Sequence, residues 1–149
     1  MIVTARKLAR ASPRRPRQAE LRRAISTAYY AVFHAIANDA AELLVGAGAL
    51  RTTSAWVQTY RALDHGFAKD ACRRVKGLGL PPGVEACANA FIHLQEARHQ
   101  ADYDPQVRYT RADALSWVER AEAAIASLRG APREDRRAFA IHLLLKRRP

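Results

Sequence analysis

Apolar residues recur every three or four positions along most of this sequence, which is the periodicity of helices that bury one face. No segment alternates between apolar and polar residues with the period of two that a half-buried strand shows. Alanine and leucine are abundant, whereas β-branched residues are sparse. The pattern therefore predicts an all-α protein.

Four long helices are expected from this pattern and from the residues that interrupt it. The first covers residues 18–44 and ends before two closely spaced glycines. The second runs from residue 54 into the seventies, and the third covers residues 83–101, after which an Asp-Pro pair closes it. Thr110 and Asp113 resemble a capping box that begins the fourth. Because short connections join these helices, we expect an up-and-down antiparallel bundle of four to five helices.

The bundle is expected to occupy the middle of the chain, over residues 18–129. Residues 1–17 are predicted to form a basic N-terminal arm or short helix, because two prolines interrupt any helix that begins there. Residues 130–149 are predicted to form a basic C-terminal tail that can include a short helix.

The net charge of +11 is concentrated at the two ends. Residues 1–23 carry a net charge of +7 and residues 129–149 carry +5, whereas the part between them carries −1. Such ends either bind phosphate backbones without sequence specificity or simply stay solvated. A basic nucleic-acid-binding protein is therefore one function class that the charge allows.

Membrane and metal-dependent functions are not favoured by the sequence. The longest uninterrupted apolar runs are too short to cross a bilayer, so we expect a soluble protein without a membrane partner. Cys72 and Cys87 stand alone, which favours a reducing, cytoplasmic setting and does not match the ligand spacing of a zinc site. The histidines show neither H-E-x-x-H nor paired spacing. We therefore expect no metal and no cofactor.

Arg98 is the first candidate for chemistry. It lies seven residues after Phe91 and four after Leu94, which places a guanidinium on the helix stripe that faces the bundle. A charge in that position has to be paired or has to reach a rim. Asp102 lies one turn further on, so a pair that fixes the helix end is one interpretation. Phosphate binding by Arg98 is the other.

A second polar stripe lies on the first long helix, next to its apolar stripe. Its members recur at i, i+4, i+7 and i+11 and are Arg23, Thr27, Tyr30 and His34. Together they supply a cation, hydroxyl donors and a base that titrates near neutral pH. Tyr30 and His34 could equally be half-buried packing residues whose polar tips reach a rim.

These segments resemble the HEPN domain, a helical domain of prokaryotic toxin–antitoxin and defence proteins. The resemblance covers about residues 18–128, in the right order. It rests on Ala28-Tyr-Tyr-Ala-x-Phe-His34, on His65-Gly66 and on Arg98-x-x-Ala-Asp-Tyr-Asp-Pro105. Gly66 falls inside the expected second helix and is interpreted as a point of close helix approach.

The resemblance implies a helical bundle that forms a homodimer. Ribonuclease members of the family carry an arginine and, four to six residues later, a histidine, and both protomers contribute to one cleft. There the cation binds the scissile phosphate and the imidazole assists attack by the ribose 2′-hydroxyl without a metal. In this chain Tyr103, Asp104 and Pro105 stand where that histidine would be.

Two functions of different classes follow. The first is an HEPN-like protein of a toxin–antitoxin or defence system that binds RNA or a nucleotide through Arg98, Arg23 and Tyr30. It would act as a metal-independent endoribonuclease through Arg98, Tyr103 and His34. The second, favoured by the missing histidine, is a non-catalytic interaction module that pairs with a minimal nucleotidyltransferase, since many relatives are encoded beside one. The sequence leaves open whether the chain is an enzyme.

Overall fold

The structure is a computed structural model that describes residues 1–146, and within that range it contains helices and no strand. The all-α prediction is therefore confirmed. The elements in chain order are α1 (Ile2–Arg10), α2 (Gln18–Leu44), η1 (Gly48–Thr52), α3 (Ser54–Arg61), α4 (His65–Arg73), η2 (Val75–Leu78), α5 (Pro82–Tyr103), α6 (Arg111–Gly130) and α7 (Arg133–Leu144).

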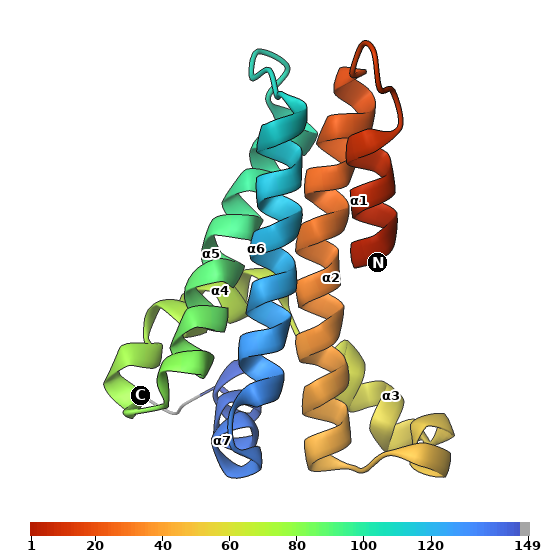
Figure 1. The fold of residues 1–149 in the computed structure, drawn as a ribbon. Coiled ribbons are helices and arrows are strands. Elements are labelled where there is room, and N and C mark those ends of the chain that lie inside the picture. The colour runs from red at the N-terminus through yellow and green to blue at the C-terminus, as the bar shows by residue number, and fades with distance from the viewer. Residues whose placement is uncertain (147–149) are drawn as a thin grey trace.

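Three long helices, α2, α5 and α6, lie side by side and form the body of the molecule (Figure 1). α5 and α6 are antiparallel neighbours joined by a short connection, as the loop length predicts. α2 runs in the same direction as α6, because the chain crosses the lower end through α3 and α4 before α5 begins. The helix count exceeds four to five because the second expected helix is divided and both ends of the chain form helices.

The second expected helix is two helices, α3 and α4, with a break at residues 62–64. Asp64 causes the break, because its Oδ1 accepts a hydrogen bond from the backbone N–H of Phe67 at 2.8 Å and caps α4. Gly66 therefore lies in the first turn of α4 rather than in the middle of a helix. It is exposed and is not a point of close helix approach.

The close approach occurs at Gly83, in the first turn of α5. A Cβ atom at this position would lie 2.9 Å from the backbone carbonyl oxygen of Ser127 on α6. Farther up, the helices meet through small side chains, and the core there consists of Ala9, Leu21, Ala24, Ile25, Ala97, Ala101 and Ala114. Alanine at these contacts allows the helix backbones to lie close together.

The predicted capping box of α6 is confirmed. The backbone N–H of Asp113 donates to Thr110 Oγ1 at 3.1 Å, and the N–H of Thr110 donates to Asp113 Oδ2 at 2.7 Å. The hydrogen bonds that the Asp113 carboxylate accepts from the backbone N–H and the hydroxyl of Thr110 lower the pKa of that carboxyl group. Aspartate thus performs the role that glutamate or glutamine usually has in this motif.

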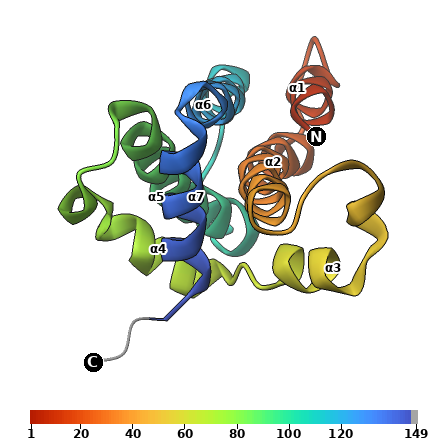
Figure 2. The same ribbon diagram turned by 90° about the horizontal axis from the view of Figure 1, so that it is seen from below.

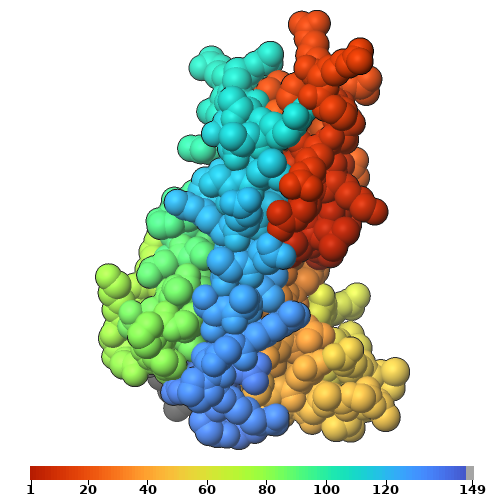
Figure 3. All heavy atoms as spheres, viewed as in Figure 1, coloured from red at the N-terminus to blue at the C-terminus, as the bar shows by residue number. Residues whose placement is uncertain are grey.

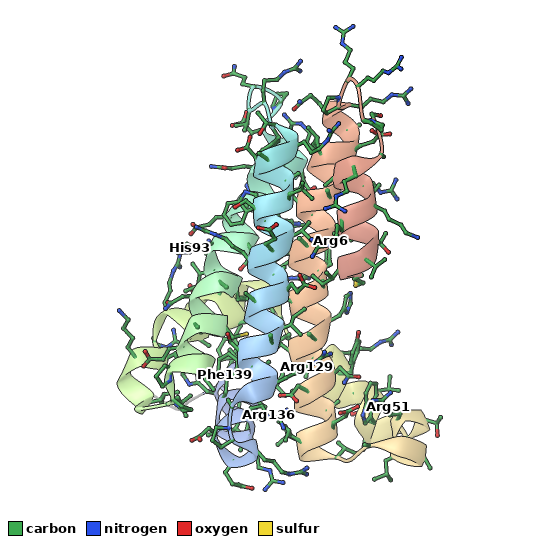
Figure 4. The ribbon with its side chains drawn as sticks, in the orientation of Figure 1. Arg6, Arg51, His93, Arg129, Arg136 and Phe139 are labelled. Carbon is green, nitrogen blue, oxygen red and sulfur yellow. The ribbon has the colours of Figure 1, made fainter. Side chains whose placement is uncertain are left out.

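Both terminal segments pack on the central helices. α1 lies along the upper parts of α2 and α6, where Ala5 and Ala9 are buried and Arg6 forms a 2.6 Å ion pair with Glu122 (Figures 3 and 4). α7 crosses the lower end between α2 and α4 and buries Phe139 and Leu143 (Figure 2). Among residues 1–146 no helix is long and apolar enough to span a membrane.

Candidate functional site

Arg98 joins the two segments that the sequence singles out. Its Nε lies 2.9 Å from Asp102 Oδ2, one turn along α5, and its Nη2 donates to the hydroxyl of Tyr30 on α2 at 3.1 Å. The side chain of Arg98 is 21 % exposed, so its charge reaches the rim of the bundle. Both interpretations of the sequence therefore meet at one residue: Arg98 is paired with Asp102, and it also faces outward.

Three tyrosine rings surround the guanidinium. Cζ of Arg98 lies 5.9, 5.5 and 5.8 Å from the ring centroids of Tyr29, Tyr30 and Tyr103, respectively. Tyr29 is fully buried, Tyr30 is half-buried and Tyr103 is 65 % exposed, so the rings lead from the core to the solvent. Cation–π attraction holds the guanidinium in place. Nη1 of Arg98 has no acceptor among the described residues.

Two neighbouring hollows lie on the surface of α5, and Arg98 lines the first of them. One, of about 390 Å³, is lined by Arg98, His99, Gln95 and Lys69 among others. The next, of about 400 Å³, extends from His99 past Tyr103 into the connection that follows. His99 thus belongs to both hollows, and its ring centroid lies 4.9 Å from that of Tyr103.

His65 is a polar residue of the site that sequence reasoning does not assign. Its Nδ1 lies 2.5 Å from the hydroxyl of Tyr29, and its ring stacks on Phe33 with centroids 4.0 Å apart. Burial, together with the charge of Arg98, lowers the pKa of His65, and burial raises that of Tyr29. A neutral imidazole and a neutral phenol therefore form a fixed hydrogen bond beneath Arg98.

The hydrogen bond of the Tyr29 hydroxyl could not be recognised from the position of this residue alone, because Tyr29 belongs to the apolar stripe of α2. The available signal is the residue type: a tyrosine in a core position requires a partner for its hydroxyl group. The partner, His65, is close because Asp64 begins a new helix there.

His34 belongs to a row of stacked rings that leads away from Arg98. The ring centroids are 6.1 Å apart for Tyr30 and His34, 5.9 Å for His34 and Tyr60, and 5.2 Å for Tyr60 and Trp56. Nδ1 of His34 lies 2.6 Å from the hydroxyl of Tyr60. His34 and Tyr60 line a separate groove of about 880 Å³ that reaches α6 and α7. His34 thus contacts Tyr30 but opens onto a different hollow from Arg98.

The structure brings together most of the candidate residues from the sequence. Arg98, Tyr30, Asp102 and Tyr103 form one cluster, and His34 adjoins it through Tyr30. Arg23 is exposed and forms neither a hydrogen bond nor an ion pair in the described part of the chain. Gly66 is not in this cluster and is only the residue that follows His65 in the chain.

This arrangement can bind an anion beside flat rings. Arg98 supplies a charge at the hollow, and Tyr103 supplies an exposed ring beside it. Lys69 also lines the hollow, but it pairs with Glu96, which lines the same hollow. Over residues 1–146 no cluster of three or more histidine, cysteine, aspartate or glutamate side chains is arranged to hold a metal ion.

Comparison with known proteins adds no relative: no protein-family model matches the sequence, and neither a curated protein nor a solved structure shows significant similarity to it.

Proposed function

We propose that this chain is an HEPN-like protein of a toxin–antitoxin or defence system that binds RNA or a nucleotide at Arg98. The supporting observation is the position of that guanidinium, which Asp102 and Tyr30 orient and three tyrosine rings surround at the edge of a surface hollow. Phosphate oxygens suit a fixed guanidinium, and nucleobases stack on exposed aromatic rings.

In the bound complex Arg98 holds a phosphate group through the edge of its guanidinium that faces the hollow. Asp102 and Tyr30 keep the other edge in place, which lowers the entropy lost on binding. Tyr103 offers its ring to an adjacent base, and Lys69 adds charge from α4, although Glu96 lies 3.1 Å from its Nζ. Arg23, two turns before Tyr30 on the same stripe of α2, contacts the strand beyond Tyr30.

Cleavage without a metal is the activity that this site would perform. The 2′-hydroxyl of the ribose attacks the adjacent phosphorus while a base removes its proton, and the bond between phosphorus and the 5′-oxygen breaks. The products are a 2′,3′-cyclic phosphate and a 5′-hydroxyl, whose oxygen takes a proton from a general acid, and Arg98 stabilises the charge that develops on the phosphoryl oxygens. Tyr103 and His34 are the proposed proton-transfer or positioning groups. Tyr30 separates His34 from Arg98, and the two residues line different hollows. His34 would therefore act in a homodimer, in which a second copy packs on α2 and α5.

The test is cleavage of a labelled single-stranded RNA in the presence of a chelator, with wild type beside Arg98→Ala. Loss of cleavage by at least about 100-fold is expected, because one charge-stabilising donor contributes roughly that much. Arg74→Ala removes an exposed arginine elsewhere and should cleave like wild type, while circular dichroism confirms equal helix content. Equal cleavage by wild type and Arg98→Ala would refute the assignment of the site.

A non-catalytic interaction module is the second candidate. The ion pair with Asp102 favours it, because a neutralised arginine stabilises the end of a helix without any substrate. In this case Tyr103 and the ring row Tyr30–His34–Tyr60–Trp56 form a contact surface for a nucleotidyltransferase. No cleavage by wild type, combined with a stable complex with a co-expressed neighbouring nucleotidyltransferase that Tyr103→Ala weakens, would support this function.

A further inference from the structure

Two connections far apart in the sequence are locked together at the upper end of the molecule (Figure 1). The side-chain amide of Gln18 donates to the carbonyl oxygen of Tyr109 at 2.8 Å and accepts from its N–H at 2.9 Å. Arg111 Nη2 donates to the carbonyl oxygens of Ser12 and Pro13 at 2.7 and 2.6 Å. The α1–α2 and α5–α6 connections are therefore one fixed surface.

A hollow of about 880 Å³ lies over this junction and carries four arginines. Arg14, Arg15 and Arg17 come from the first connection, and Arg108 comes from the second. All four are exposed, none forms an ion pair in the described chain, and no acidic residue lines the hollow. Side chains that end in nitrogen project beyond the ribbon at this end (Figure 4).

The acidic residues nearby are already engaged with local donors. Glu20 Oε2 accepts from the hydroxyl of Ser12 at 2.6 Å, and Asp104 Oδ1 accepts from the N–H of Gln106 at 2.9 Å. Asp113 caps α6. The charge of the four arginines is therefore not neutralised by direct pairing within the described chain.

The first turn of α2 adds a second source of positive potential. This 27-residue helix begins after Arg17, which makes no side-chain cap, and no acceptor within the described residues pairs with the backbone N–H groups of Gln18 and Ala19. Unpaired N–H groups and the helix dipole favour an anion at this position. Arg17 and Gln18 line the hollow itself, so the helix end and the arginines face the same space.

A continuous series of contacts leads from this end to Arg98. Tyr30, Ser26 and Arg22 follow at four-residue spacing on one face of α2, and each contacts the neighbouring stretch of α5 or its end. From lower to upper the pairs are Tyr30–Arg98, Ser26–Asp102 and Arg22 with the carbonyl oxygen of Asp104. Arg98 lies five residues before the end of α5, which is about 8 Å of helix.

We infer that the upper end of the molecule is an anchoring site for the phosphodiester backbone of an RNA strand. Arg14, Arg15, Arg17 and Arg108 contact successive phosphates, and the N-terminus of α2 holds one of them. The inference rests on the proposed function and deepens it, because the anchored strand continues along α2 and α5 to Arg98. It assigns the anchoring to this one end and not to the basic residues at both ends of the chain.

The test measures the affinity of the full chain for a labelled 12-nucleotide single-stranded RNA over a series of salt concentrations. The apical variant is Arg14→Gln/Arg15→Gln/Arg17→Gln. Its matched control, Arg61→Gln/Arg74→Gln/Arg133→Gln, removes three exposed arginines that form no ion pair in the described chain and lie away from the hollow. Arg98→Gln is measured in parallel, because it tests the proposed function separately.

The apical variant should bind at least about tenfold more weakly at low salt, and the slope of log K against log salt should fall by about 2, as expected for the loss of three contacts to a single strand. The control should change affinity less than about threefold, since it keeps all apical contacts. A similar loss in both variants would overturn the inference, because net charge alone would then explain binding.

The remaining outcomes separate the two proposals. Loss of binding in Arg98→Gln with wild-type binding in the apical variant would refute the apical anchor and leave the proposed function intact. The reverse result would support the anchor and refute RNA binding at Arg98. Absence of RNA binding by wild type would refute both.

Discussion

At the residue scale, the hydrogen bond between Tyr29 and His65 shows what can and cannot be predicted from a sequence. The apolar periodicity of α2 predicts that Tyr29 faces the core, and Tyr29 is fully buried. The partner of its hydroxyl could not be predicted, because His65 reaches it only where α3 has ended and Asp64 begins α4. In the same way, the pattern predicts that Arg98 shares the stripe of Leu94, but it does not reveal which rings surround it.

His65 should make the stability of the protein depend on pH below about 6.5, the pKa expected for histidine in an unfolded chain. Burial lowers the pKa of His65 in the folded state, so as the pH falls the unfolded state takes up the proton first. The free energy of unfolding therefore decreases on acidification, by at most about 1.4 kcal/mol per pH unit for this one group, and levels off above that pH.

Urea unfolding at pH 7.5 and at pH 5.5 measures this loss of stability. The comparison is His65→Asn, because the side-chain amide of asparagine occupies the place of the histidine Nδ1 but does not titrate. The variant should lose less stability between the two pH values than wild type does. An equal loss in both proteins would show that His65 is not the titrating group.

At the element scale, the contact between α5 and α6 depends on a single missing side chain. Gly83 follows two prolines, so the sequence presents it as the first residue of a helix that begins after a turn. Its actual role depends on the Ser127 carbonyl of another helix, and no local pattern contains that information. The bounds of α2 and the cap of α6 were predictable because their signals are local, whereas helix contacts join distant residues.

Replacement of Gly83 by alanine should destabilise the protein by about 1–3 kcal/mol, because the new methyl group meets backbone that cannot rotate away. Gly130→Ala is the matched control at the same end of this pair of helices. A Cβ there meets nothing within 4 Å, so its stability should stay within about 1 kcal/mol of wild type or rise. Thermal unfolding of both variants measures the difference. Equal melting temperatures for Gly83→Ala and Gly130→Ala would contradict the close contact between α5 and α6.

At the scale of the whole molecule, α7 packs across the lower end of the bundle, and the composition of the segment does not predict this position. The segment after residue 130 is short and basic, and its periodicity indicates a helix without showing what it packs against. In the structure Arg136 forms a 2.5 Å ion pair with Asp39 on α2, and His142 Nε2 lies 2.8 Å from the carbonyl oxygen of Ala71 on α4. Arg136 and Phe139 lie at the foot of the bundle (Figure 4).

Phe139→Ala should therefore lower the stability of the whole protein, by about 3–5 kcal/mol, because it leaves a cavity in the shared core. Ile141 lies on the same helix and is 41 % exposed, so Ile141→Ala should lower the stability far less. Chemical unfolding followed by circular dichroism and by tryptophan fluorescence should give one coincident transition for wild type. An early loss of part of the helical circular dichroism signal, before the fluorescence of Trp56 on α3 and Trp117 on α6 changes, would show that α7 is not part of the cooperative core.

The position of α1 against both α2 and α6 has a consequence for protein synthesis. α1 and α2 leave the ribosome early and can begin to pair, because they are joined by a short connection. The surface of α1 that meets α6, where Arg6 pairs with Glu122, stays uncovered until α6 has been made. During synthesis the buried alanine face of α1, which includes Ala5 and Ala9, is therefore exposed to chaperones until α6 has emerged.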